Sequence, residues 1–305
     1  MRCKVLFVGL GSIGQRHLRN IITLFNSRNI DFQIDALRTK NQSHDGIANV
    51  YIKTNELPSD YDIAFVTNPT NAHYETMLFL QDKAKHLFVE KPIFDRVRDF
   101  SFKSGICYVA CPLRFNPVVR SLKQFVQSNN VFAFRAICSS YLPDWRPGTN
   151  YKTNYSAIKS MGGGVELDLI HEIDYLTWIF GKTTKLHSVF GKKSNLEIDS
   201  NDLALYILEF VGVLGSLHLD YFGRYSEGNK REIEVFTNND TVLFDIVNSR
   251  ISYQFSSKIT PLDKEDPYLN EMNYFLDLIT SDNPENYNNC SSATETLKIA
   301  LGGQA

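Results

Sequence analysis

Three polar side chains near the middle of the chain have the residue types that proton transfer needs. Asp168, His171 and Asp174 follow one another at three-residue intervals, shortly after the triple glycine 162–164. Imidazole is the side chain whose ordinary pKa lies nearest neutrality, so His171 can take or give a proton at working pH. An aspartate beside it can orient the ring or bind a substrate hydroxyl. We therefore expect Asp168 and His171 to be catalytic and to contact the substrate.

A helix must position these side chains. The apolar pattern predicts one helix over 165–180, ended by Gly181. Residues three apart are neighbours on a helix, so Asp168 and His171 would share one face. The glycines before the helix lose much conformational freedom on folding, and they suit a place where the backbone approaches another group closely. The alternative is structural, with an acidic first turn and a buried histidine.

A third candidate catalytic residue, Lys91, belongs to another predicted element. Residues 86–89 have the pattern of a buried strand, which ends in Glu90-Lys91-Pro92. In a sheet of parallel strands, the carboxyl ends of the strands border the ligand crevice. An ammonium group there stabilises a developing alkoxide. The alternative is an exposed lysine in a loop before a proline.

The start of the chain predicts what else binds at such a crevice. An apolar strand over 5–8 ends at Gly9, and a helical pattern follows, with the spacing G-x-G-x-x-G. Gly9 makes a tight turn, Gly11 lets a pyrophosphate approach the backbone, and Gly14 lets the helix pack on the strand. The first turn of the helix adds N–H donors and a partial positive charge. We predict a dinucleotide site that includes Gly9, Gly11, Ser12, Ile13 and Gly14.

The second predicted strand, 32–38, bears on the choice of cofactor. The residue at its end meets the adenosine ribose, where an acid binds both hydroxyls and an arginine accepts a 2′-phosphate. Here the strand ends at Arg38, and Asp35 lies within the strand, two or three residues too early. We expect NAD(P) as the cofactor, with Arg38 favouring NADP. The alternative is an arginine that stacks on the adenine or lies in solvent.

The remaining elements predict an α/β protein of two domains. Up to residue 116, strands alternate with helices, which is typical of parallel βαβ units. Beyond it, six strand-like segments between 186 and 255 are mostly joined by short turns, and they indicate a mostly antiparallel sheet with a helix on its face. We expect residues 1–116 to bind the dinucleotide and residues 117–305 to bind the substrate and to oligomerise. An exposed face of the second sheet favours a homodimer or homotetramer.

Composition excludes several classes of protein. The chain has 305 residues, of which 43% are hydrophobic and 22% charged, as in soluble globular proteins. A net charge of −2 favours neither nucleic acid nor an anionic membrane as a partner. No apolar run approaches the ~18 residues of a membrane-spanning helix. Residues 1–8 lead directly into the glycine turn rather than forming a signal peptide, so we expect a cytoplasmic protein.

The cysteines lack a metal-binding or disulfide framework. They are five in number, at positions 3, 107, 111, 138 and 290. Cys107 and Cys111 are four residues apart, but no C-x-x-C motif or Cys/His cluster accompanies them, so we expect no metal site. We interpret the cysteines as buried, reduced thiols in a cytoplasmic protein.

Four motifs in order along the chain resemble those of the glucose–fructose oxidoreductase/inositol dehydrogenase (Gfo/Idh/MocA) family. They are Gly9-Leu10-Gly11-Ser12-Ile13-Gly14, Thr67-Asn68-Pro69 with His73, Glu90-Lys91-Pro92, and Gly162-Gly163-Gly164 with Asp168, His171 and Asp174. The resemblance implies a Rossmann domain and an α/β domain whose open sheet often forms an oligomer interface. It also implies that Lys91 lies beside the nicotinamide and the substrate oxygen. The motifs extend the expected cofactor-binding residues to Thr67, Asn68, Pro69, His73, Glu90 and Lys91.

One spacing departs from that family. Many of its members have an aspartate four residues before the histidine, whereas Asp168 and His171 are three residues apart. His171 keeps the family spacing to Asp174, so the family histidine corresponds to His171. Both spacings leave the pair on one face of the expected helix.

An aromatic and basic loop supplies further expected substrate contacts. A planar side chain such as Trp145 suits the apolar face of a sugar ring, and Asp144 suits hydroxyl groups. Arg146 or Lys159 suits a phosphate or carboxylate. The expected substrate-binding residues are Arg114, Asp144, Trp145, Arg146, Tyr151, Tyr155, Lys159, Asp168 and His171. The alternative is an amphipathic surface loop or a subunit contact.

These expectations indicate an NAD(P)-dependent oxidoreductase. Hydride would pass between C4 of the nicotinamide and a hydroxyl or keto carbon of a sugar, a cyclitol, or a phosphorylated or nucleotide-linked sugar. His171 or Lys91 would remove or return the hydroxyl proton. One alternative is an enzyme that keeps its nicotinamide bound and catalyses isomerisation or elimination through transient oxidation. The other is a non-catalytic dinucleotide-sensing regulator, which would need neither Lys91 nor His171.

Overall fold

The glycine turn belongs to a sheet of six parallel strands in the computed structural model, which describes residues 2–303. In sheet order the strands are β3 (Asn49–Tyr51), β2 (Phe32–Leu37), β1 (Cys3–Val8), β4 (Tyr61–Val66), β5 (Ala84–Val89) and β6 (Cys107–Val109). All neighbouring pairs run parallel. Residues 5–8 of β1 and 63–66 of β4 are buried, as in sheets that are covered on both faces. The expected Rossmann sheet is confirmed.

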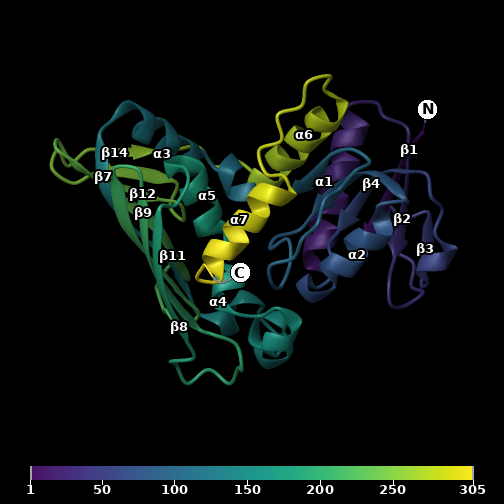
Figure 1. The fold of residues 1–305 in the computed structure, drawn as a ribbon, viewed down its shortest axis with the longest axis horizontal. Helices are drawn as coiled ribbons and strands as arrows, with labels where there is room; N and C mark the ends of the chain where they lie inside the picture. The colour runs from purple at the N-terminus through teal and green to yellow at the C-terminus, as the bar shows by residue number, and fades with distance from the viewer. Residues whose placement is uncertain (1, 304–305) are drawn as a thin grey trace. The chain divides into compact units, whose positions relative to one another are not determined.

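Helices pack around this sheet (Figure 1), and aromatic rings contribute to the core. The helices are α1 (Ser12–Ser27), α2 (His73–Leu80), α6 (Pro267–Thr280) and the first part of α7 (Cys290–Ala300). The ring of Phe88 lies 5.1 Å from that of Phe65 and 5.2 Å from that of Phe275, between centroids. Such aromatic pairs bury large apolar areas, so α6 is anchored to the sheet although it comes from the far end of the chain.

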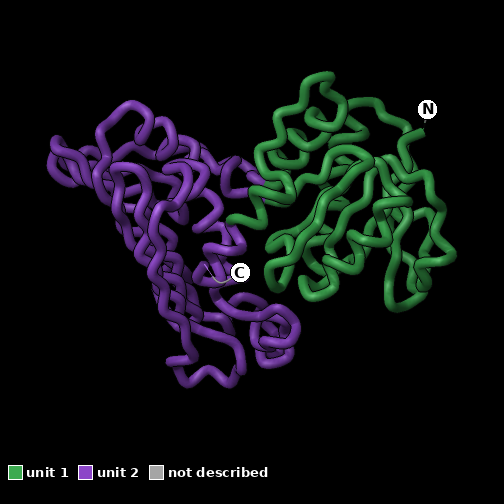
Figure 2. Tube along the Cα trace, viewed as in Figure 1, with its two compact units in different colours: residues 1–110, 268–295 green, residues 111–267, 296–305 purple. Residues whose placement is uncertain are grey.

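The chain divides into two units, as Figure 2 shows: residues 1–110 with 268–295, and residues 111–267 with 296–305. This division differs from the expected boundary between 116 and 117, because α6 returns to the first unit. Arg28, which follows α1, donates to Asp277 of α6 at 2.6 Å, and the Arg16 guanidinium lies 3.9 Å from the ring centroid of Tyr268. An amphipathic helix can cover either sheet, so the pattern of α6 alone does not say which sheet it covers.

The second unit contains a sheet of eight strands. In sheet order they are β14 (Ile259–Pro261), β13 (Arg250–Tyr253), β12 (Thr241–Asp245), β11 (Asn229–Thr237), β7 (Val131–Ser140), β10 (Val213–Asp220), β9 (Leu203–Phe210) and β8 (Lys185–Gly191). β7 and β10 run parallel, and the other neighbouring pairs run antiparallel. The expected mostly antiparallel sheet is confirmed.

Three of the described α-helices lie wholly within this second unit (Figure 1). They are α3 (Pro117–Ser128), α4 (Val165–Asp168) and α5 (His171–Phe180). Asn116 begins α3, because its Oδ1 accepts from the N–H of Val118 at 2.9 Å. At the end of α5, Phe180 stacks on Phe134 of β7 with centroids 4.9 Å apart. That contact places α5, which begins at His171, on the buried face of the sheet.

Short 3-10 helices join these elements. They are η1 (Thr54–Glu56), η2 (Thr70–Ala72), η3 (Pro112–Phe115), η4 (Leu142–Trp145), η5 (Tyr151–Thr153), η6 (Tyr155–Ala157) and η7 (Lys159–Met161). Four of them follow one another between β7 and α4, so the loop expected to bind substrate is structured. Within residues 2–303, no helix combines the length and the apolar character needed to cross a membrane.

Candidate active site

The glycine turn has the geometry of a phosphate-binding turn. Gly9 has a φ of +91°, and a Cβ there would lie 2.8 Å from the backbone nitrogen of Asn68. A Cβ on Gly14 would lie 2.7 Å from the carbonyl oxygen of Gly9. A Cβ on Gly11 would meet no described atom within 4 Å. Packing therefore requires Gly9 and Gly14, whereas Gly11 leaves space for a phosphate at the N-terminus of α1.

Side chains after β4 hold this turn. The Thr67 hydroxyl donates to the carbonyl oxygen of Gly9 at 2.7 Å, and the Asn68 amide donates to Thr76 Oγ1 at 2.8 Å. The Oδ1 atom of Asn68 is buried and has no hydrogen-bond partner among residues 2–303. A buried acceptor without a donor costs free energy, so this atom fits a ligand that donates to it. Together with the open Gly11, this acceptor fits a dinucleotide.

Arg38 lies at the end of β2, next to the same turn. The N–H of Gly9 donates to the carbonyl oxygen of Leu37 at 3.1 Å. Arg38 is half-buried, and its Nη1 donates to the carbonyl oxygen of Gln42 at 2.7 Å. A guanidinium has five N–H donors, so one bond to a loop carbonyl leaves it able to bind a phosphate as well.

The acid of the same strand has a different environment. Asp35 is buried and accepts from the Asn49 amide at 2.9 Å and from the Tyr61 hydroxyl at 3.0 Å. Burial and the charge of Asp35 raise the pKa of Tyr61 far above its ordinary range, so this phenol stays protonated and donates. Asp35 is therefore held inside the sheet and is not presented to a ribose.

Lys91 lies two residues after the end of β5, and the buried side chain of Glu90 holds its backbone. Glu90 Oε2 accepts from the N–H of Lys91 at 3.1 Å, and Glu90 Oε1 lies 2.5 Å from His17 Nε2. Burial alone would raise the pKa of Glu90, but the hydrogen bond and charge of His17 and the charge of Lys91 outweigh it and lower this pKa. Glu90 is thus an anion that accepts from the backbone of Lys91 and pairs with His17.

His73 has a similar positioning role. It is buried at the start of α2, which Pro69 and η2 precede. Its Nε2 lies 2.9 Å from the carbonyl oxygen of Asn68, and its Nδ1 lies 3.1 Å from that of Pro92. Burial lowers the pKa of His73, so the ring is neutral and donates to one of these carbonyls. His73 therefore connects the Asn68 turn with the loop that follows Lys91.

In the second unit, the expected single helix over 165–180 is wrong. α4 ends at Asp168, and α5 begins at His171. Leu169 has φ −96° and ψ 26°, and its carbonyl oxygen accepts from the N–H of Glu172, three residues later. Asp168 and His171 are both buried but lie on either side of a break. The helix-face argument for this pair therefore does not apply.

Two tyrosines bind the side chain of Asp168. The Tyr221 hydroxyl donates to Asp168 Oδ2 at 2.6 Å, and Tyr155 also forms a side-chain hydrogen bond with Asp168. The charge of Asp168, followed by burial, raises the pKa of Tyr155 far above its ordinary range. Burial, followed by the charge of Asp168, does the same for the pKa of Tyr221. Both phenols stay protonated, and they hold the carboxylate in place.

The triple glycine allows this arrangement. A Cβ on Gly163 would lie 2.2 Å from the carbonyl oxygen of Tyr155. Gly164 has a φ of +140°, and a Cβ there would lie 2.8 Å from Glu166 Oε2. Burial raises the pKa of Glu166, whose Oε1 accepts from the Asn201 amide at 2.7 Å. The close approach expected at these glycines is thus to the chain's own backbone and to a buried carboxyl group.

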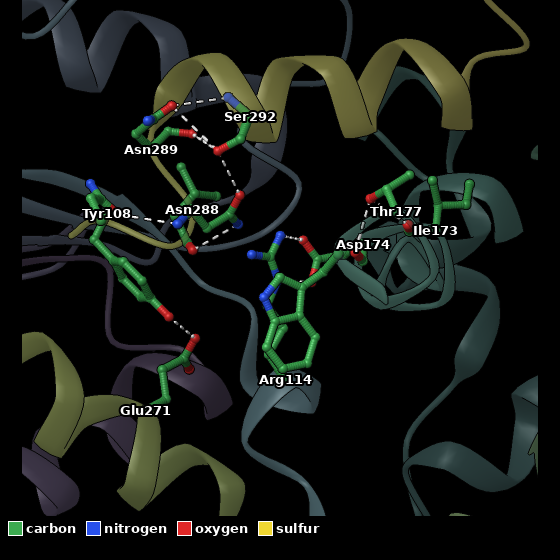
Figure 3. A network of polar contacts seen from close by, with 12 residues as sticks. Tyr108, Arg114, Ile173, Asp174, Thr177, Glu271, Asn288, Asn289 and Ser292 are labelled. Atoms are coloured by element: carbon green, nitrogen blue, oxygen red, sulfur yellow. Dashed lines mark hydrogen bonds and ion pairs between the residues drawn. The ribbon is translucent and has the colours of Figure 1, made fainter. Parts of the chain in front are cut away.

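Arg114, an expected substrate contact, pairs with Asp174 (Figure 3). Its Nε lies 2.9 Å from Asp174 Oδ2 and its Nη2 lies 2.7 Å from Asp174 Oδ1. Both residues are buried. A bidentate pair of this kind fixes the guanidinium plane, so Arg114 positions α5 and with it His171.

Two residues of the expected substrate loop lie against the tyrosines that bind Asp168. The ring of Trp145 packs edge-on against Tyr221, with centroids 5.3 Å apart. The Arg146 guanidinium lies 5.6 Å from the ring centroid of Tyr155. An aromatic and a basic side chain therefore contact the two tyrosines that bind this carboxylate.

The other expected loop residues make contacts elsewhere. Asp144 and Lys159 are exposed. The N–H of Lys159 donates to Asp199 Oδ1 at 2.7 Å, and the Tyr151 hydroxyl accepts from the N–H of Glu197 at 3.2 Å. These contacts attach the loop to residues 197–199.

Sequence reasoning missed three residues: His17 as the partner of Glu90, Tyr221 as the donor to Asp168, and Arg224. The Arg224 guanidinium lies 3.7 Å from the ring centroid of Tyr141, where the substrate loop begins. A signal existed for His17, since it lies on the apolar face of the first helix, where a buried polar group needs a partner. Tyr221 and Arg224 follow β10 and reach the loop only through strand pairing, so no local pattern identifies them.

Two family models match consecutive parts of the chain. Residues 3–101 match the GFO/IDH/MocA model described as "Oxidoreductase family, NAD-binding Rossmann fold". Residues 119–242 match the "GFO/IDH/MocA C-terminal domain". The two matches together cover more than half of the chain, and they correspond to the two sheets described above.

Individual proteins agree with these models. The chain is 26% identical to myo-inositol 2-dehydrogenase of Thermotoga maritima, over 91% of this chain and 88% of that protein. A crystal structure of an oxidoreductase from Thermotoga maritima has a TM-score of 0.82 at 17% identity, covering 98% of this chain and 95% of that one. The WlbA dehydrogenase of Bordetella pertussis, solved with NADH and UDP-GlcNAcA, has a TM-score of 0.76 at 15% identity. The match covers 99% of this chain and 96% of that one. These structures share the fold.

Proposed function

The chain belongs to the Gfo/Idh/MocA family of NAD-binding oxidoreductases, and on this basis we propose that it is a dehydrogenase of a sugar-like substrate. Hydride passes between C4 of the nicotinamide and a carbon of the substrate that bears a hydroxyl or keto group. The relatives named as dehydrogenases support chemistry over dinucleotide sensing.

The observation that carries this proposal is the way Lys91 is held. Its backbone follows β5 and is bound by the anionic Glu90, which His17 fixes to the helix of the glycine turn. A regulator that only senses a dinucleotide has no need of a lysine positioned in this way. The placement suits a group that acts on the reacting end of a bound dinucleotide.

We propose that His171 or Lys91 carries out proton transfer. In oxidation, one of them takes the proton of the substrate hydroxyl, and in reduction it returns the proton. The ammonium of Lys91 stabilises negative charge on the substrate oxygen. Of the two roles expected for Asp168, we propose that it binds the substrate rather than orients His171. Tyr155 and Tyr221 hold its carboxylate, which accepts a hydrogen bond from a substrate hydroxyl.

We propose NADP as the preferred cofactor. Arg38 lies at the end of β2 beside the glycine turn, and Asp35 is occupied inside the sheet. A cation at this place attracts a 2′-phosphate, and the missing carboxylate removes the usual repulsion of it.

The proposed substrate is an anionic sugar derivative, such as a sugar phosphate, a sugar acid or a nucleotide sugar. Arg146 and Arg224 each lie over a tyrosine ring, at 5.6 Å and 3.7 Å from the centroid. Aromatic faces preorganise both guanidinium groups, and arginine binds phosphate and carboxylate in a planar, bidentate manner. Trp145 beside Tyr221 supplies an aromatic surface for the sugar ring.

We propose that the open face of the second sheet forms a homodimer or homotetramer. Val189 of β8 lies opposite Leu205 of β9 in the antiparallel pair. Val189 is 62% exposed and Leu205 is 37% exposed. Ile207 and Leu214 extend this apolar face. An exposed apolar face of this kind favours a symmetric contact with a second copy. The free thiols support a cytoplasmic location.

The test is a screen of the purified protein for nicotinamide-dependent turnover. NADH and NADPH are offered with keto-inositols, keto-sugars, sugar phosphates, sugar acids and nucleotide sugars, and the oxidised cofactors are offered with the corresponding alcohols. We expect a change of nicotinamide absorbance with an anionic sugar derivative. Substrate conversion without any absorbance change would show a bound cofactor that cycles within each turnover. Cofactor binding without conversion of any compound would contradict the proposal.

A further inference from the structure

Cys107 and Cys290 lie side by side, although 183 residues separate them in the sequence. Their Sγ atoms are 2.9 Å apart, both residues belong to the first unit, and both are free thiols. A disulfide bond is about 2.05 Å long, so the sulfurs need to approach by less than ~1 Å. We propose that this pair is a redox site, which closes to a reversible disulfide when the protein meets a hydroperoxide.

Hydrogen bonds hold the two segments in register. β6 is the edge strand of its sheet, and residues 286–290 lie along its free edge. The N–H of Val109 donates to the carbonyl oxygen of Asn288 at 2.9 Å, and the Asn288 amide donates to the carbonyl oxygen of Val109 at 3.0 Å. The Asn286 amide donates to the carbonyl oxygen of Cys107 at 2.8 Å. These bonds fix the backbone on both sides of the thiols, so the pair is preorganised.

The turn that leads to Cys290 is itself well bonded (Figure 3). Ser292 Oγ donates to Asn288 Oδ1 at 3.2 Å, and the N–H of Ser292 donates to Asn289 Oδ1 at 3.0 Å. Asn289 thereby caps the start of α7, whose first residue is Cys290. The position of Cys290 opposite β6 is therefore set by the cap and by the edge pairing together.

The two thiols differ in accessibility. Cys107 is 6% exposed, whereas Cys290 is half-buried. Burial, together with the hydrogen bond and charge of Cys290, raises the pKa of the Cys107 thiol well above its ordinary value. An oxidant in solution therefore reaches Cys290 first, and Cys107 reacts second.

The chemistry balances with one peroxide. The Cys290 thiolate attacks a peroxide oxygen, the O–O bond breaks, and Cys290 becomes a sulfenic acid while the peroxide leaves as water or an alcohol. The sulfur of Cys107 then attacks that of Cys290, and the hydroxide leaves as water with the proton of Cys107. Two thiols are oxidised and one peroxide is reduced. A dithiol reverses the reaction by exchange.

The bond would fasten the first residue of β6 to the first turn of α7. The chain passes to the second unit shortly after each of these places, between 110 and 111 and between 295 and 296. A cross-link over such a long loop restricts the unfolded chain, so the oxidised protein is expected to resist unfolding better than the reduced protein.

The experiment uses the full chain, treated with hydrogen peroxide, alkylated, and digested without reductant for mass spectrometry. We expect a cross-linked peptide that contains Cys107 and Cys290, and a fall in alkylated thiols from five to three. The melting temperature is expected to rise by at least ~4 °C and to return after dithiothreitol treatment.

Two serine variants separate this site from general oxidation. Cys290→Ser, at a half-buried position, is expected to abolish both the cross-link and the rise in melting temperature. Cys3→Ser, at the other half-buried cysteine, is expected to keep both. Five alkylated thiols after peroxide treatment, a sulfinic acid on Cys290 beside a free Cys107, or a cross-link between other cysteines would each overturn the proposal.

Discussion

The imidazole of His17 and the carboxylate of Glu90 lie 2.5 Å apart in the core of the first unit, where the two residues are 0% and 7% exposed. His17 belongs to the helix that begins at the glycine turn, and Glu90 directly precedes Lys91. The ring of Phe88 lies 4.8 Å from that of His17, between centroids, so apolar surroundings strengthen the pair. This pair connects the phosphate-binding helix with the lysine that we assign to proton transfer.

We predict that Glu90→Gln lowers turnover more than it lowers cofactor binding. The amide keeps the shape of the side chain but loses the charge, so Lys91 is held less firmly, and we expect kcat to fall at least ~10-fold. The free energy of unfolding should fall by about 1–3 kcal/mol, because His17 loses its charged partner. Glu75→Gln, an exposed position on α2, is the matched control and should change neither quantity. An unaltered kcat in Glu90→Gln would contradict the positioning role.

The same pair predicts a pH dependence of stability. The pKa of Glu90 lies below its ordinary value of 4.5 in the folded chain, so the unfolded chain binds this proton more readily. The stabilising contribution is therefore complete above the unfolded pKa and is lost as the pH falls through the folded pKa. Denaturant titrations of the wild type and of Glu90→Gln should give stability curves that converge as the pH is lowered from neutrality into this acid range. Parallel curves would argue against an ionised Glu90.

For the proton-transfer residues, we predict that Lys91→Ala and His171→Ala each lower kcat about 10²–10⁴-fold. The dissociation constant of NADPH should change little, because neither residue belongs to the glycine turn. Lys85→Ala, an exposed lysine on the same strand β5, is the control for Lys91 and should retain turnover. Near-normal turnover in both variants would remove the assignment.

We predict that Tyr221→Phe weakens the substrate site. The phenol donates to Asp168 at 2.6 Å, and the loss of a hydrogen bond to a charged group is expected to lower kcat/KM by ~10–100-fold. Tyr206→Phe is the matched control, because its buried hydroxyl donates to the carbonyl oxygen of Ala300 at 2.8 Å. Equal losses of kcat/KM in both variants would show that Tyr221 serves stability alone.

The cofactor preference can be tested at Arg38. We predict that Arg38→Ala weakens NADPH binding ~10–100-fold and leaves NADH binding nearly unchanged, because the proposed ligand contact of this charge is with the 2′-phosphate alone. Arg19→Ala, an exposed arginine on α1, is the control. Tighter binding of NADH than of NADPH by the wild type would reverse the proposed preference.

The oligomer can be tested on the exposed face of β9. Ile207 is 47% exposed, and a lysine there would place a charge within the apolar face. We predict that Ile207→Lys yields a monomer in sedimentation and light-scattering measurements, because an unpaired charge in an apolar interface is costly. Val211→Lys, at an 86% exposed turn position beside the same strand, should retain the oligomer. A monomeric wild type would contradict the proposal directly.

The tertiary structure decided the roles of several polar residues. Helix periodicity placed Asp168 and His171 on one helical face, but the helix is interrupted between them, and Asp168 is bound by Tyr155 and Tyr221. Strand pairing brings Tyr221 next to Asp168. Because the paired strands are distant in sequence, no local pattern predicts this contact. The sequence likewise does not indicate which sheet α6 packs against, because its apolar face fits either one. In the structure, Phe275 of α6 contacts Phe65 and Phe88 of the first sheet.

By itself, the sequence determined the two sheets, the glycine turn and the placement of Lys91 after a strand. These follow from hydrophobic periods and from glycines whose backbone geometry few other residues adopt, and such signals are local. The tertiary structure decided which polar groups meet: His17 with Glu90, Arg114 with Asp174, and Cys107 with Cys290. The reason is that a contact between side chains depends on how distant elements pack. A sequence pattern indicates which face of a helix or strand is apolar, but it does not indicate which other element packs against that face.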